Sequence, residues 1–96
     1  MTYVKCYWDE TRADQYAGWG NSWWYFEFAP EGHVTRHVEV YDSGVRLRYG
    51  PDHMADSFGR LAEARRQDIQ MPAPVELSAE QFEAAWASAE PSSTDR

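Results

Sequence analysis

The stretch WWYFEFAPEGHVTRHVEVYDSGVRLRY, residues 23–49, holds three runs of aromatic and β-branched side chains separated by two turn motifs. Such side chains favour the pleated, half-buried surface of a sheet. The turn motifs, Ala-Pro-Glu-Gly-His and Asp-Ser-Gly, contain the residue types that suit tight turns. The stretch therefore predicts three successive antiparallel strands over roughly residues 23–28, 34–41 and 45–49.

A fourth strand is predicted at residues 3–8, where Val4, Cys6 and Trp8 alternate with side chains that face the other way. Near the other end, Ser78-Ala79-Glu80-Gln81 has the spacing of a capping box and predicts the start of a helix. An apolar stripe follows over residues 82–89. We expect this stripe to pack on the sheet face that carries the valines of the third strand.

The connection between sheet and helix is less regular. Asp56 and Ser57 can cap a short helix that runs to Arg66, whereas residues 67–74 contain two prolines and predict an irregular connector. The expected fold class is therefore α+β. It has a four-stranded, mainly antiparallel sheet, a C-terminal helix packed on one face, and a short helix in the connection. The strand order is left open.

Composition limits the class of protein. The 96 residues suit one domain, expected over residues 1–90, with a disordered tail at 91–96. A formal charge of −7 and scattered basic residues argue against nucleic acid or an anionic membrane as the partner. Cys6 is the one cysteine, so no internal disulfide can form. No apolar run resembles a signal peptide or a membrane span, so a cytoplasmic location is expected.

Two registers are open in the predicted sheet. We prefer pairing Phe28 with Val34 in the first hairpin and Val40 with Leu47 in the second, because opposite charges then meet across strands. A three-residue Asp-Ser-Gly loop would shift the second hairpin by one residue. In the preferred register, Trp24 lies opposite Val38 in the core.

The preferred register gathers polar and aromatic side chains on the outer sheet face. Trp and Tyr often anchor protein interfaces, so these side chains are the candidate partner-binding site. The alternative is that cross-strand ion pairs and a covering loop account for them. The candidates are Trp19, Trp23, Tyr25, Glu27, His37, Glu39, Tyr41 and Arg48.

Catalytic and metal-binding motifs are not evident in the sequence. Glu27, His37 and Glu39 could act as a general base, but no nucleophile motif accompanies them. His33 and His37 lack a matching third metal ligand. We therefore expect neither an enzyme nor a cofactor or metal.

The sequence favours a non-catalytic protein-binding module that uses an acidic, aromatic sheet face, with a basic protein or a second copy as partner. The alternative is a small-molecule-binding domain. Its groove would lie between sheet and helix and be lined by aromatic residues, including Trp24, and by Arg36, which interrupts an apolar strand face. A purely structural Arg36, stacked on a core aromatic ring, is the competing interpretation.

Three motifs resemble an uncharacterised bacterial domain family. They are Tyr25-Phe26-Glu27, Gly32-x-Val34-Thr35-Arg36-x-Val38-Glu39-Val40-Tyr41-x-x-Gly44 and Phe82-Glu83-x-x-Trp86. The likeness covers roughly residues 3–87. Members of this family are small, Trp-rich cytoplasmic proteins of unknown function, and some look like immunity proteins of toxin systems. The resemblance implies an immunity-type inhibitor of a bacterial toxin. It supplies no catalytic residues, and Glu27, Arg36, Glu39 and Trp86 could equally be fold determinants.

Overall fold

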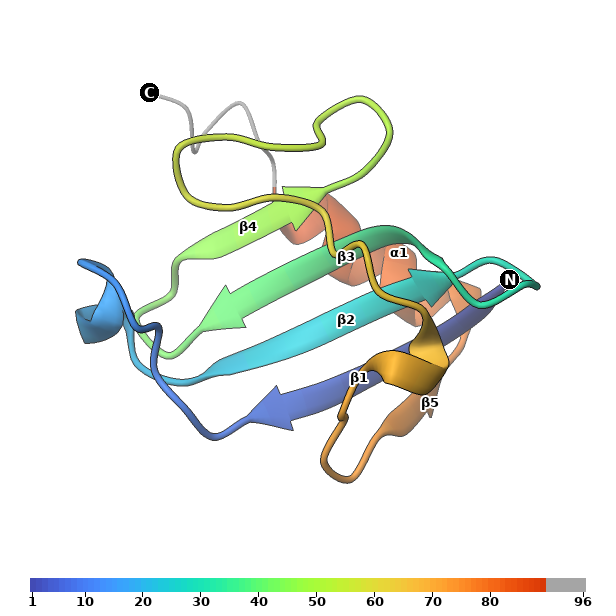
Figure 1. Ribbon diagram of the computed structural model, residues 1–96, viewed down its shortest axis with the longest axis horizontal. Helices are drawn as coiled ribbons and strands as arrows, with labels where there is room; N and C mark the ends of the chain where they lie inside the picture. The colour runs from blue at the N-terminus through green and yellow to red at the C-terminus, as the bar shows by residue number, and fades with distance from the viewer. Residues whose placement is uncertain (90–96) are drawn as a thin grey trace.

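The computed structural model describes residues 1–89, which form one five-stranded antiparallel sheet and one α-helix (Figure 1). The strands lie in the order β4-β3-β2-β1-β5. Their bounds are β1 Thr2–Trp8, β2 Ser22–Phe28, β3 Val34–Tyr41, β4 Arg46–Tyr49 and β5 Val75–Leu77, and α1 spans Ala79–Ser88. The α+β class, the antiparallel sheet and the C-terminal helix are confirmed. The tail predicted for residues 91–96 lies outside the described residues.

The prediction of four strands is wrong, because β5 adds a fifth on the free side of β1. This strand has three residues, Val75–Leu77, which is too short to show an alternating pattern. It pairs Tyr3 with Leu77 and Lys5 with Val75, directly before α1 begins.

The predicted helix from Asp56 to Arg66 is also wrong. Residues 50–74 cross the sheet without an α-helix, and a 3-10 turn at Arg66–Asp68 is the regular element there. The Asp56 carboxylate accepts the N–H groups of Phe58 and Gly59 and the Tyr49 hydroxyl. The side chain that was expected to cap a helix instead holds a turn against the sheet.

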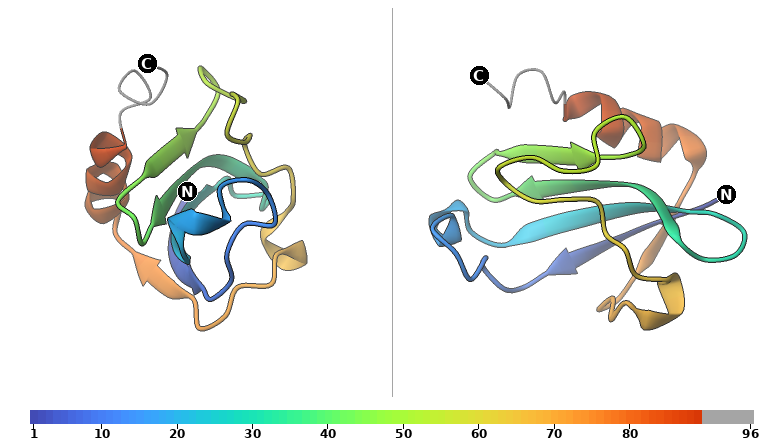
Figure 2. Two further views of the ribbon diagram at one scale, coloured as in Figure 1. Left: turned by 90° about the vertical axis from the view of Figure 1, so that its left-hand side faces the viewer. Right: turned by 45° about the horizontal axis from the view of Figure 1, so that its top comes forward.

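The sheet is covered on both faces (Figure 2). Helix α1 packs on one face, named here the helix-side face, and residues 50–74 cross the other, named the loop-side face. A 3-10 turn at Ala17–Trp19, in the β1–β2 connection, adds to the loop-side cover. Each face therefore has its own apolar core.

A β-bulge between β2 and β3 corrects the predicted register. Phe28 pairs with Val34 as expected, but Glu27 then pairs with Arg36, so Thr35 is an extra residue in β3. One extra residue shifts the partner of every later residue pair by one position. Consequently Trp24 lies opposite Glu39, and the predicted pairing of Trp24 with a core valine is wrong.

The second hairpin also takes the register that was not preferred. Val40 pairs with Arg46, and the Tyr41 N–H donates to the Val45 carbonyl across a three-residue Asp-Ser-Gly loop. Gly44 has φ +97°, a left-handed conformation that closes such a loop without Cβ strain. The expected cross-strand neighbours, Glu39 opposite Arg48 and Tyr41 opposite Arg46, are therefore wrong, and Glu39 lies opposite Leu47 instead.

Helix α1 matches its prediction. Ser78 Oγ accepts the Gln81 N–H, and the Gln81 side chain accepts the Ser78 N–H, which completes the capping box. Phe82 is fully buried against Val38 on the helix-side face, as the apolar stripe predicts. No helix in residues 1–89 is both long enough and apolar enough to cross a membrane.

Candidate functional site

The eight residues predicted to form one partner-binding surface lie on two opposite faces of the sheet. Four are on the helix-side face: Trp23, Tyr25, Glu27 and Arg48. The other four are on the loop-side face, three from β3 and one from its cover: His37, Glu39, Tyr41 and Trp19. The prediction of one shared outer face is therefore wrong. Alternation within each strand is as expected, but the bulge changes which strand faces coincide.

His37, Glu39 and Tyr41 form a buried polar network rather than an exposed surface. Their exposed fractions are 0%, 3% and 4%. Glu39 accepts hydrogen bonds from His37 Nε2 at 2.8 Å and from the Tyr41 hydroxyl at 2.5 Å. Arg12 lies 3.9 Å from the same carboxylate and donates to the Tyr41 oxygen at 3.3 Å. Each polar group thus has partners, which offsets the cost of burying a carboxylate.

Both ring nitrogens of His37 are engaged. The Ala62 N–H donates to Nδ1 at 3.2 Å, so the proton of the neutral ring resides on Nε2 and points at Glu39. The Trp24 ring stacks on the imidazole with centroids 5.0 Å apart. With no free lone pair and no exposed atom, this histidine supplies no base to a substrate on the surface. Glu27, on the opposite face, is not part of the same site.

A second polar cluster lies beside this network. The Tyr49 hydroxyl donates to Asp56, and His53 Nε2 lies 2.9 Å from the same carboxylate. Burial acts to raise the pKa of Asp56, but the hydrogen bonds from His53, Phe58, Tyr49 and Gly59 outweigh it and hold the pKa below its usual range. Burial raises the pKa of Tyr49. This cluster fixes the start of residues 50–74 on the sheet.

Arg36 joins the sheet to the helix. Its guanidinium donates to Glu27 at 2.8 and 2.6 Å and to Glu83 of α1 at 3.2 and 2.5 Å. It also lies over the rings of Phe82 and Trp86, at 5.0 and 4.8 Å. The hydrogen bonds from Arg36 lower the pKa of Glu27. The hydrogen bonds to Glu27 and Glu83 in turn raise the pKa of Arg36. Arg36 is therefore a packed, fully engaged cation.

This arrangement overturns the predicted ligand groove lined by Arg36 and Trp24. Arg36 lies on the helix-side face and Trp24 on the loop-side face, so the two side chains are separated by the sheet. The competing interpretation, a structural Arg36 stacked on a core ring, considered Trp24 or Phe26 as that ring, and both lie on the loop-side face. Arg36 stacks on aromatic rings of α1 instead.

Two guanidinium groups contact the ring of Trp86. Arg36 is 4.8 Å and Arg48 4.5 Å from its ring, and Arg48 also donates to the Trp86 carbonyl at 2.9 Å. The predicted partner-binding residue Arg48 is thus held against the helix. Three of the motif positions quoted above, Glu27, Arg36 and Trp86, meet in this one cluster and fasten α1 to the sheet.

The helix leaves part of its own face of the sheet uncovered. Trp23 is 36% exposed there, with the Tyr7 ring 5.2 Å and the Lys5 ammonium 5.0 Å from its own ring. We name this surface the Trp23 patch. It consists of Lys5, Tyr7, Trp23, Tyr25, Val40, Arg46 and Val75.

A groove of about 400 Å³ separates the Trp23 patch from α1. Its sheet side contains Lys5, Tyr25 and Arg46, and its helix side contains small side chains such as Ala84 and Ala85. Sequence patterning did not point to Lys5 or Arg46, because each is a single charged residue in a strand whose alternation does not show which residues of other strands share its face. The signal that could have found them is the shared face with Trp23, and that face depends on register.

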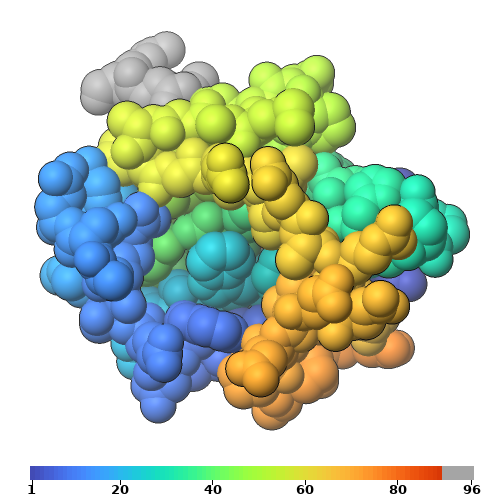
Figure 3. All heavy atoms as spheres, viewed as in Figure 1, coloured from blue at the N-terminus to red at the C-terminus, as the bar shows by residue number. Residues whose placement is uncertain are grey.

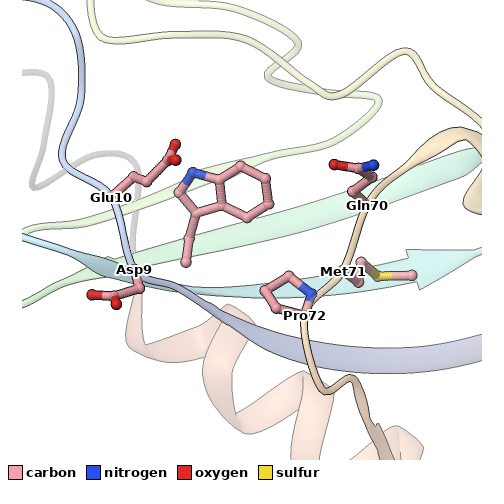
Figure 4. A pocket seen from close by; sticks show the side chains of 6 residues that line it. Asp9, Glu10, Gln70, Met71 and Pro72 are labelled. Carbon is pink, nitrogen blue, oxygen red and sulfur yellow. The ribbon is translucent and has the colours of Figure 1, made fainter.

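The loop-side face is hollowed between the end of β1 and the segment at 70–72 (Figure 3). This open hollow of about 510 Å³ is lined by Trp8, Asp9 and Glu10 on one side and by residues 70–72 on the other. Glu10 and Gln70 stand on opposite sides of it (Figure 4). Trp8 shares the strand face of Val4 and Cys6, as the alternation predicts, but it is half-buried and forms the wall of this hollow.

Within residues 1–89, no group of three or more His, Cys, Asp or Glu side chains is placed to hold a metal ion. Comparison with known proteins found no matching family model, no matching curated protein and no matching solved structure. The fold and the surfaces described above are therefore the basis for the function proposed below.

Proposed function

We propose that this protein is a binding module that docks a partner protein on the Trp23 patch. The observation that carries the proposal is the exposure of Trp23, 36%, on a sheet face that α1 leaves open. A large ring held by Tyr7 and Lys5 loses little freedom on binding, and Trp and Tyr are the side chains that most often dominate interface energies.

The charge around Trp23 indicates the chemistry of the partner. Lys5 and Arg46 are the charged residues of the patch, and among residues 1–89 no carboxylate lines the adjoining groove. A partner that offers an apolar anchor flanked by acidic side chains fits this surface. The basic partner expected from the net charge fits it less well, because Glu27 and Glu39, the acids expected on the binding face, are buried.

An immunity-type inhibitor is the specific form of this proposal that the family resemblance suggests. In that form a toxin is the partner, and inhibition is steric, since a rigid sheet face covers the toxin surface. The acidic apolar segment would then belong to the toxin.

A small anionic ligand is the second candidate. The groove between α1 and the sheet, about 400 Å³, falls within the usual range of ligand pockets, roughly 300–1,000 Å³. Its cations are Lys5 and Arg46 rather than Arg36.

Site-specific photo-cross-linking tests the protein-binding proposal. The candidate partners are the purified proteins encoded by the genes next to the gene of this protein. A benzophenone side chain at position 23 is expected to cross-link to one of them. The same side chain at position 54 is the matched control, because Met54 is 59% exposed but lies outside the patch. Trp23→Ala is expected to weaken the captured complex by about 2 kcal/mol or more, and Lys5→Glu to slow its formation at low salt.

Equal capture from positions 23 and 54, or an affinity that Trp23→Ala leaves unchanged, would contradict the proposal. Cross-linking of the protein to itself at position 23, with a dimer in light scattering, would identify a second copy as the partner. Weak binding of small dicarboxylates that depends on Lys5 and Arg46, without any protein partner, would favour the ligand groove.

A further inference from the structure

A cavity of about 180 Å³ lies under the covering segment on the loop-side face. We name it the Trp24 cavity. It is lined by Cys6, Trp8, Trp24, Phe26, Ala62, Glu63, Ala64 and Ile69. Protein interiors rarely leave voids larger than a water molecule, and an apolar cavity of about 150 Å³ stays dry and can hold a benzene ring. The Trp24 cavity is therefore large enough for one aromatic ring.

The cavity exists because the covering segment places small side chains above large rings. Ala62 and Ala64 lie over the sheet where Trp24 and Phe26 form its floor. These two rings stack with centroids 6.0 Å apart, and Trp24 stacks on His37 below. A planar ring entering the cavity would extend an existing row of stacked rings, an arrangement that aromatic pairs favour.

The Trp24 cavity and the open hollow share Trp8 as a wall, and their other walls meet at the neighbouring residues Ile69 and Gln70. Atoms of β2 are visible at the bottom of this recess (Figure 3). A ligand can therefore place a ring in the cavity and a polar group in the hollow. That polar group would lie on or beside the Trp8 indole.

Among the residues that the structure describes, every charged one that lines the cavity or the hollow is acidic. Glu63 lines the cavity, and Asp9 and Glu10 line the hollow. Asp9 accepts a hydrogen bond from Asn21, whereas within residues 1–89 Glu10 makes no ion pair. The contact of Glu63 with Arg60, at 3.6 Å between two exposed side chains, is a weak pair. A cation over an indole is favourable in addition.

We propose that the Trp24 cavity binds a small aromatic amine, whose ring fills the cavity and whose ammonium group lies between Trp8 and the acidic rim. This site is separate from the Trp23 patch, on the other face of the sheet, and does not depend on the function proposed for that patch.

Three probes of equal size and different charge test the proposal: 2-phenylethylamine, 2-phenylethanol and phenylacetate. Binding is followed by the indole N–H signals of Trp8 and Trp24 in nuclear magnetic resonance spectra, with the Trp23 signal as internal control. The amine is expected to bind about threefold to fivefold more tightly than the alcohol at low salt. The acid is expected to bind more weakly than the alcohol, and the preference for the amine should shrink as salt is added.

Variants separate the ring site from the charge site. Ala62→Leu is expected to fill the cavity and abolish binding of all three probes. Ala64→Leu is the second filling variant if the first disturbs the hydrogen bond from Ala62 to His37. Glu10→Gln combined with Glu63→Gln should keep ring binding but bring the amine to within about twofold of the alcohol. Trp23→Ala should change none of these affinities.

The proposal is overturned if none of the three probes shifts the indole N–H signals of Trp8 and Trp24. Equal affinities for the amine and the alcohol at low salt would also overturn it, as would binding that survives both filling variants in folded protein. Because Trp23→Ala and the filling variants act on opposite faces, failure here and failure of the partner-binding proposal are distinguishable.

Discussion

Thr35 is the residue on which the composition of both sheet faces depends. It is the extra residue of the bulge, and its hydroxyl donates to the Glu27 carbonyl at 3.1 Å and to the Glu27 carboxylate at 2.7 Å. Without this extra residue, His37 and Glu39 would share a face with Trp23, as the alternating pattern predicts. A single inserted residue therefore separates the polar side chains of β3 from the exposed ring of β2.

Glu27 illustrates how one buried carboxylate supports the fold. Hydrogen bonds from Arg36 hold its pKa below the usual value for glutamate, about 4.3. A carboxylate with a lowered pKa in the folded state contributes stability above its unfolded pKa, and this contribution is lost as the pH falls through the folded pKa.

We therefore predict that Glu27→Gln lowers the free energy of unfolding by about 1–3 kcal/mol at pH 7. The deficit should shrink as the pH falls below the usual pKa of glutamate, about 4.3, and through the lowered pKa of folded Glu27. Urea titrations at several pH values measure this. Glu83→Gln is the matched control, because Glu83 binds the same guanidinium but its side chain is 53% exposed; we expect a loss of about 0.5 kcal/mol or less. A Glu27→Gln deficit that is independent of pH would contradict the argument.

At the scale of elements, the attachment of α1 to the sheet depends on close packing near Gly50. A Cβ atom added there would lie 2.9 Å from Cη2 of Trp86 and 3.1 Å from Cγ of Arg36. The Trp86 ring is rigid and also contacts the guanidinium groups of Arg36 and Arg48, so moving it away would disturb both contacts. The end of β4 can therefore approach the helix only because residue 50 has no side chain.

Gly50→Ala is predicted to destabilise the protein by about 1–3 kcal/mol through overpacking. The Cβ of Gly18→Ala would meet no atom within 4 Å, so this control should be close to neutral. In the Trp86→Ala background the cost of Gly50→Ala should largely disappear, because the clashing ring is gone. Thermal unfolding of the four variants measures these differences. Additive effects of Gly50→Ala and Trp86→Ala would show that the contact is not the cause.

At the scale of the whole molecule, an irregular segment rather than a helix covers the loop-side face of the sheet. Residues 50–74 shield His37, Glu39 and the loop-side core, yet contain a 3-10 turn as their regular element. Leu61 packs against both buried clusters of this face. Detaching the segment would expose apolar rings and the buried carboxylate together.

Leu61→Ala is predicted to lower the free energy of unfolding by about 2–3 kcal/mol, at the low end for leucine because the side chain is half-buried. It should also increase hydrogen exchange at the Ala62 amide, which donates to His37. Met54→Ala, at a 59% exposed position of the same segment, is the control and should have little effect. Stability equal to that of the control would mean that the segment contributes little to the core.

Local patterns in the chain were sufficient for the fold class, the alternation within each strand and the capping box of α1. These features depend on contacts between residues that are close in sequence, and period-2 and period-3.6 patterns report such contacts directly. The Trp23–Tyr49 stretch and Ser78–Gln81 are the examples.

Which strand faces coincide, and hence which candidate residues meet solvent, emerged only when the strands were paired. The extra residue Thr35 shifts the register between β2 and β3 by one residue, and residues 50–74 cover a sheet face that the sequence pattern left open. Both outcomes depend on contacts between residues distant in the chain, and no local pattern encodes them. For that reason His37 and Glu39 are buried supports of the fold, while Trp23 on one face and the Trp24 cavity on the other are the sites proposed for binding.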